Sequence, residues 1–246
     1  MKKINNKRIY FLKAFIIIQF TINLSIFFRK NKFFFMQDND NNYFNKVIDI
    51  SVKKNLIKFI ELTIEEQKFL FRLIRRLKPK KIVEIGVSAG GSAYIILNAI
   101  KDMNKAKLFS IDRLTQWYRN NSKNVGWLIK DNFPELMENW SLFTGKNTAE
   151  FIESIGNNID LVFIDTMHIT PGEMLNWLEI LPFLKEEAIV VFHDIFYMFT
   201  KEFLNKTIIK NFSNNQLLCY IRGKLIFPSY NATIFRKNIG AIKLAK

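Results

Sequence analysis

Residues 83–92, which read VEIGVSAGGS, decide the fold of this chain. A short apolar run ends at Ile85 and a helical pattern begins at Ser92, so the three glycines occupy a turn between a strand and a helix. Glycine lets the backbone turn tightly and approach a ligand closely. The N-terminus of the following helix offers free N–H groups to an anion. The stretch therefore predicts a ligand-binding turn at the carboxyl end of a sheet strand.

Strands and helices alternate outward from this turn. Residues 63–66, TIEE, match a capping box and predict the start of a helix. The predicted strands are 81–85, 107–111, 140–143, 159–164 and 188–192, and the predicted helical segments are 92–103, 124–138, 148–155, 172–184 and 201–210. Residues 216–221 and 232–236 are predicted to form a closing antiparallel hairpin. This order indicates a Rossmann-like α/β fold with a doubly wound, mostly parallel seven-stranded sheet and helices on both faces.

The 246-residue chain carries 37 Lys and Arg against 22 Asp and Glu, a formal net charge of +15. Such a charge is typical of proteins that bind nucleic acid or anionic lipid. Residues 1–40 account for +6 and residues 201–246 for +8, whereas residues 41–200 hold twenty basic and nineteen acidic side chains. The nearly neutral middle argues against a duplex-binding domain. The basic ends fit either a membrane-surface footprint or an AT-rich coding bias toward Lys, Asn, Ile and Phe.

The sequence divides into a basic, apolar N-terminal arm, residues 1–40, and a globular domain, residues 41–246. Residues 9–28 are long enough to span a bilayer, although polar side chains interrupt them. A helix on a membrane surface or partner, a membrane span and a helix packed on its own domain all stay open. The single cysteine, Cys219, excludes an internal disulfide framework and fits a cytoplasmic location, with the arm at the inner face of the membrane.

Polar side chains stand at the ends of three predicted strands. Asp112 ends the second strand, Asp165 and His168 follow the fourth, and His193 and Asp194 follow the fifth. An acid at the end of the second strand can accept hydrogen bonds from both hydroxyls of a ribose. The chain has only two histidines, and both fall at these strand ends. Since open α/β sheets bind ligands at this edge, the pattern predicts an active site there.

The glycine turn has an acid two residues before its first glycine. This pattern, E-x-G-x-x-x-G-x-S, resembles class I S-adenosylmethionine (SAM) methyltransferases, and is most similar to the catechol O-methyltransferase-like and macrolide-sugar O-methyltransferase groups. The resemblance covers roughly residues 63–196. It implies that Glu84 lies beside bound SAM, that Ser92 touches the methionine carboxylate and that Asp112 holds the ribose. The residues it assigns to SAM are Glu84, Gly86, Ser88, Gly90, Ser92 and Asp112.

The same resemblance implies a divalent metal and a general base at the polar strand ends. Asp165, His193 and Asp194 would be the metal ligands, with Asp165 also catalytic, and His168 would take the proton from the acceptor hydroxyl. A bound metal lowers the pKa of a hydroxyl, and a neutral imidazole accepts a proton. In the families that the chain resembles, the two adjacent residues after the fifth strand are normally acids or amides, whose oxygen atoms suit magnesium. His193 departs from this pattern and favours manganese, iron or zinc. Catalysis without a metal stays open.

The sequence therefore predicts a SAM-dependent O-methyltransferase that acts on a hydroxyl of a small molecule or glycan. A catalytically inactive binding protein of this fold at a membrane is one alternative. An NAD-dependent dehydrogenase is another, which Ser88 and Glu84 disfavour because neither fits the dinucleotide turn. Nucleic acid is disfavoured as a substrate because residues 165–168, DTMH, replace the Asn/Asp-Pro-Pro-aromatic motif. The expected partners are the acceptor, a membrane surface and a second copy of the chain in a homo-oligomer.

Overall fold

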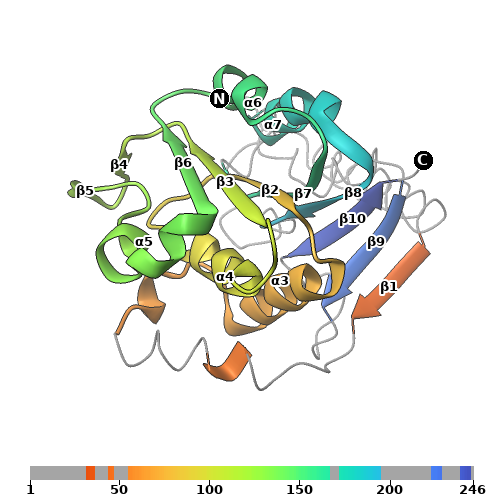
Figure 1. Ribbon diagram of the computed structural model, residues 1–246, viewed down its shortest axis with the longest axis horizontal. Helices are drawn as coiled ribbons and strands as arrows, with labels where there is room; N and C mark the ends of the chain where they lie inside the picture. Colours follow the sequence, from red (N-terminus) through yellow and green to blue (C-terminus); the bar gives the residue numbers. More distant parts are fainter. Residues whose placement is uncertain are drawn as a thin grey trace, which may run out of the picture.

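The structure is a computed structural model, and it describes residues 32–36, 44–46, 55–166, 172–194, 223–228 and 239–244. Eight of the described strands form one sheet (Figure 1). In spatial order they are β1 (Lys32–Met36), β9 (Gly223–Pro228), β10 (Gly240–Leu244), β8 (Leu184–Phe192), β7 (Ile159–Ile164), β2 (Lys81–Ile85), β3 (Lys107–Asp112) and β6 (Trp140–Thr144).

Five consecutive strands, β8-β7-β2-β3-β6, are parallel to one another. The chain moves in one direction from β2 through β3 to β6, and in the other from β7 to β8. The order therefore reverses between β2 and β7. In open α/β sheets, ligands bind at such a switch point, outside the carboxyl ends of the strands.

Helices cover both faces of the sheet (Figure 1). One layer holds α3 (Ile64–Leu77), α4 (Gly91–Ile100) and α5 (Trp127–Asn132), and the other holds α6 (Thr148–Ile155) and α7 (Gly172–Ile180). Successive strand residues point to opposite faces. Ile82 of β2 accordingly packs in the core of the first layer, while Val83 and Ile85 pack in the core of the second. Two buried cores explain why these strands read as continuous apolar runs.

Local sequence signals explain where α3 begins. The backbone N–H of Thr63 donates to Oε2 of Glu66 at 2.7 Å, and the backbone N–H of Glu66 faces Oγ1 of Thr63 at 3.4 Å. This is the predicted capping box, and it satisfies two of the N–H groups left without partners at a helix start. A short two-stranded sheet of β4 (Gln116–Trp117) and β5 (Asn120–Asn124) follows β3. The described 3-10 helices are η1 (Ile57–Phe59), η2 (Pro134–Asn139) and η3 (Leu181–Phe183).

The predicted fold class is confirmed, including the antiparallel hairpin near the C-terminus, where β10 pairs with both β9 and β8. The sheet has one strand more than predicted, because residues 32–36 of the N-terminal arm pair in parallel with β9. That pairing joins segments about 190 residues apart, so no local sequence pattern predicts it. The closing strands lie at 223–228 and 240–244, and the predicted segments 201–210, 216–221 and 232–236 fall outside the described residues.

Residues 1–31 of the predicted arm also lie outside the described residues, so its membrane association stays a prediction. Among the helices that the structure describes, none combines the length and the apolar character needed to cross a bilayer.

Candidate active site

A cavity of about 440 Å³ opens at the carboxyl ends of β2, β3 and β7. It lies at the switch point of the sheet. Its lining comprises Glu61, Leu62, Ile85, Gly86, Val87, Ser88, Gly91, Ser92, Ile111, Asp112, Arg113, Leu114, Tyr118, Lys146, Asn147, Thr148, Asp165, Thr166, Leu175, Asn176 and Glu179. Of the six residues predicted to bind SAM, Gly86, Ser88, Ser92 and Asp112 line this cavity.

The glycine turn has a conformation that requires glycine. Gly86 has φ +92°, and a Cβ placed there would lie 1.9 Å from the backbone oxygen of Asp165. Gly91 opens α4, and a Cβ there would lie 2.6 Å from the Cα of Ile60. The turn is therefore pressed between the end of β7 and the segment before α3, and side chains larger than hydrogen do not fit.

Asp112 ties the glycine turn to β3. Its Oδ2 accepts hydrogen bonds from the backbone N–H groups of Val87 at 3.0 Å and Ser88 at 3.1 Å, and its Oδ1 accepts from Leu114 at 2.9 Å. A carboxylate offers about four lone-pair positions, so one position stays available to a ligand hydroxyl. The carboxylate thus has a second role that the sequence did not reveal, because it holds the turn in shape as well as facing the cavity.

Glu84 lies behind the cavity wall rather than in it. Its carboxyl group is completely buried. Oε1 accepts a hydrogen bond from Oγ of Ser92 and Oε2 accepts one from Oγ of Ser110, both at 2.5 Å. Burial raises the pKa of Glu84 to about 8, although the two hydroxyl donors lower it. Glu84 therefore supports the ligand site through Ser92, the residue between it and the cavity.

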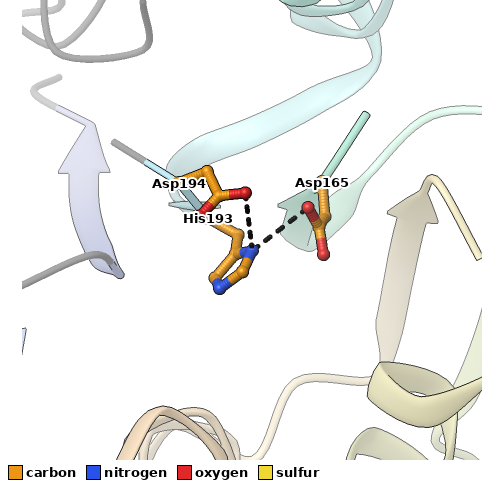
Figure 2. Close-up of side chains that lie close together, drawn as sticks. All are labelled: Asp165, His193 and Asp194. Atoms are coloured by element: carbon orange, nitrogen blue, oxygen red, sulfur yellow. Dashed lines mark hydrogen bonds and ion pairs between the residues drawn. The ribbon is translucent and has the colours of Figure 1, made fainter. Parts of the chain in front are cut away.

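The predicted metal ligands come together at the ends of β7 and β8 (Figure 2). The Nδ1 of His193 lies 3.2 Å from Oδ1 of Asp165 and 3.8 Å from Oδ2 of Asp194. One ligand atom from each side chain can be chosen so that all three lie within 4.8 Å of one another. Asp165 also lines the cavity, so this cluster adjoins the predicted cofactor site.

His193 is buried, and acidic groups surround it. Burial alone would lower the pKa of His193, but Asp165, Glu66 and Asp194 outweigh it and raise the pKa well above its usual value. Glu66 is the member of this group that the sequence did not reveal. It belongs to the capping box of α3, and its Oε2 lies 3.5 Å from Nε2 of His193. The capping pattern marks Glu66 as a helix-start residue, and only the packing of α3 brings it to the strand ends.

Two further parts of the cavity wall were not predicted. On one side, the Tyr118 hydroxyl donates to Oε1 of Glu61 at 2.8 Å, and Nη2 of Arg119 lies 2.6 Å from the same oxygen. On the other side, Nδ2 of Asn176 donates to Oγ1 of Thr148 at 3.2 Å. These contacts join segments distant in sequence, so the wall depends on tertiary structure.

His168, the predicted base, lies outside the described residues. Gly90 caps α4 with φ +102° and does not line the cavity.

Comparison with known proteins agrees with this fold. Residues 83–195 match the family described as "Methyltransferase domain". Among solved structures, the O-methyltransferase TomG from Streptomyces achromogenes, involved in tomaymycin synthesis and solved with SAM, has a TM-score of 0.53 at 14% identity, over 84% of this chain and 92% of that chain. The O-methyltransferase from Bacillus cereus, solved with S-adenosylhomocysteine (SAH), has a TM-score of 0.52 at 12% identity, over 83% and 92% of the two chains.

An SAH-bound methyltransferase from Podospora anserina has a TM-score of 0.52 at 14% identity, over 93% of this chain and 96% of that chain. No curated protein sequence matches significantly. At these identities the solved structures establish a shared fold, while the family match covers the glycine turn and the polar ends of β7 and β8. Residues 83–195 therefore match a methyltransferase domain, and the chain shares its fold with solved O-methyltransferases.

Proposed function

We propose that this protein is a SAM-dependent methyltransferase that transfers a methyl group to a hydroxyl oxygen. The observation that carries the proposal is the cavity at the switch point, which the glycine turn, Asp112 and Asp165 line together. A cofactor-binding turn and a set of polar groups suited to acceptor chemistry thus share one space. The SAM-bound and SAH-bound O-methyltransferases of the same fold support the cofactor assignment.

The charges around the cavity suit SAM. The cofactor carries a cationic sulfonium and an α-ammonium group, and the lining contains four carboxylates, Glu61, Asp112, Asp165 and Glu179. Its α-carboxylate has a matching position at the start of α4, where free backbone N–H groups and the helix dipole favour an anion. Ser92 lines the cavity in this first turn of α4. The site therefore offers separate partners for each charged group of SAM.

The proposed reaction is a direct displacement. The acceptor hydroxyl gives its proton to a base, for which His168 is the candidate, and the oxygen forms a bond to the methyl carbon of SAM. The bond between that carbon and sulfur breaks, and its electron pair stays on sulfur, so the products are the methyl ether and SAH. Because the sulfonium already activates the methyl group, the protein acts mainly by aligning donor and acceptor.

Asp165, His193 and Asp194 fit a divalent metal, because they offer one nitrogen and two carboxylates close together. A metal bound there would lower the pKa of the acceptor hydroxyl. We propose this assistance as part of the function. The acceptor class is a small molecule or glycan, and the small-molecule pathway named for TomG supports that class.

Calorimetry tests the proposal. SAM should bind the full chain, and NAD should not. Asp112→Asn should weaken SAM binding about tenfold or more, since a hydrogen bond to a charged group contributes about 1.5–3 kcal/mol. Asp131→Asn is the matched control, because Asp131 pairs with Lys123 on the surface of α5 and does not line the cavity. Tighter binding of NAD than of SAM would refute the assignment.

A further inference from the structure

A buried carboxylate, Glu66, stands behind His193 on the side opposite the metal-ligand cluster. Its Oε2 lies 3.5 Å from Nε2 of the imidazole, while Nδ1 faces Asp165 and Asp194 at 3.2 Å and 3.8 Å. The side chains of His193 and Glu66 are 7% and 4% exposed, so water does not screen this pair. The ring is thus held between one carboxylate at Nε2 and two at Nδ1.

Glu66 is itself held in place by secondary structure. Oε2 accepts a 2.7 Å hydrogen bond from the backbone N–H of Thr63, as part of the capping box of α3. The carboxylate is therefore fixed on a rigid element and not on a loop. Residues on a rigid element position a site more accurately than residues on loops.

Histidines that bind a metal through one ring nitrogen almost always donate the other N–H to a carboxylate, a backbone carbonyl or water. If Nδ1 binds a metal, the remaining ring proton lies on Nε2, and a carboxylate beside Nε2 favours that state. In that tautomer the lone pair of Nδ1 is directed toward Asp165 and Asp194. Glu66 lies on the Nε2 side of the ring, 3.5 Å away, where such a partner would stand.

We propose that Glu66 is a positioning residue that fixes the tautomer of His193, and that it makes the cluster of Asp165, His193 and Asp194 selective for metals that accept nitrogen ligands. The inference rests on the proposed function, which places a metal in this cluster. Imidazole suits iron, cobalt or zinc, whereas magnesium prefers oxygen ligands. The chain should therefore bind Co²⁺ more tightly than Mg²⁺.

The decisive variant is Glu66→Gln. Glutamine at this position keeps the capping box, which accepts either residue, and removes only the carboxylate charge. Mutation of such outer residues typically lowers metal affinity 10–100-fold. Glu65→Gln is the matched control, because Glu65 lies in the same turn but pairs with Lys68 at the surface. Thr63→Ala is a second control, because it weakens the cap and leaves the carboxylate of Glu66 in place.

The experiment titrates the full chain with Co²⁺, following its visible absorption, and with Mg²⁺ by calorimetry. We expect tighter binding of Co²⁺ than of Mg²⁺, a 10–100-fold weaker Co²⁺ affinity in Glu66→Gln, and unchanged affinity in both controls. His193→Asp should reduce the preference for Co²⁺ over Mg²⁺. An unchanged Co²⁺ affinity in Glu66→Gln, or binding of Mg²⁺ as tight as that of Co²⁺, would overturn the inference.

SAM calorimetry on the same samples separates this inference from the proposed function. If SAM binds and the metal results fail, the role of Glu66 is wrong and the cofactor assignment stands. If SAM does not bind, the proposed function fails whatever the metal titration shows.

Discussion

Single residues set the shape of the glycine turn. Gly86 and Gly156 both have positive φ, at +92° and +75°, but their surroundings differ. A Cβ on Gly86 would meet the backbone of Asp165 at 1.9 Å, whereas the nearest atom to a Cβ on Gly156 is 3.9 Å away. A comparison of substitutions at the two positions therefore distinguishes the cost of backbone strain from the cost of a steric clash.

Gly86→Ala should destabilise the protein by more than about 3 kcal/mol, because the clash with backbone adds to the strain. Gly156→Ala carries the strain alone, at a φ of 75° and a ψ of 179° that essentially only glycine adopts, and should cost about 1–3 kcal/mol. Urea unfolding measures both values. Equal losses in the two variants would show that the end of β7 moves aside and that Gly86 is not pressed against it.

Glu84 should make stability depend on pH. Its pKa is about 8 in the folded protein, against an ordinary value of 4.5, so the folded state retains a proton that the unfolded state has lost. The free energy of unfolding should therefore fall as pH rises from about 4.5 to about 8. At about 1.4 kcal/mol for each pKa unit, this contribution is on the order of 5 kcal/mol.

Urea unfolding between pH 5 and pH 9 tests this. Glu84→Gln cannot ionise, so its stability should vary less with pH than that of the wild type. Glu153→Gln, at an exposed position on α6, is the control and should follow the wild type. Identical pH profiles for the wild type and Glu84→Gln would contradict the raised pKa.

His168→Ala should abolish methyl transfer and leave SAM affinity nearly unchanged, because the base acts on the acceptor and not on the cofactor. Activity is measured as SAH released from SAM with catechol and simple sugars as acceptor probes, and affinity by calorimetry. Turnover equal to that of the wild type would remove His168 as the base.

At the scale of elements, α3 has two tasks. Its apolar face fills the core of the first layer, where Phe69, Leu70, Leu73 and Ile74 are buried. Its first turn carries Glu66 to the end of β8, beside His193. The capping box thus defines the helix start and also places a charge near the candidate metal site.

Thr63→Ala should lower the free energy of unfolding by about 1 kcal/mol, the usual cost of losing an N-cap side chain. Urea denaturation of the full chain measures the change. The midpoint should fall with an unchanged m-value, since the same surface is exposed on unfolding. An unchanged midpoint would show that the interaction with Thr63 does not stabilise α3.

At the scale of the whole molecule, the charge is divided unevenly. Residues 1–40 carry +6 and residues 201–246 carry +8, whereas the segment that forms the cavity is close to neutral. The nearly neutral middle segment suits a cationic cofactor, and the basic terminal segments suit a negatively charged partner.

The full chain should co-sediment with vesicles that contain anionic lipid, and not with neutral vesicles. Each Lys or Arg near an anionic surface contributes about 1 kcal/mol, and salt screens this attraction. Binding should therefore weaken between low and high salt. Absence of binding to anionic vesicles at low salt would leave coding bias as the explanation of the basic ends.

The sequence alone determined the fold class, the glycine turn and the polar residues at the strand ends. These features depend on local patterns: apolar runs buried on two faces, a capping box, and glycines between a strand and a helix. For the same reason it identified Asp112, Asp165, His193 and Asp194 as residues that parallel strands bring to one edge.

Tertiary structure decided the rest. It paired residues 32–36 with β9, placed Glu84 behind Ser92 and out of the cavity, and brought Glu66 to His193. Each of these depends on contacts between segments that lie apart in the chain. Local propensity and periodicity carry no information about such contacts, because they depend on how the helices and strands pack.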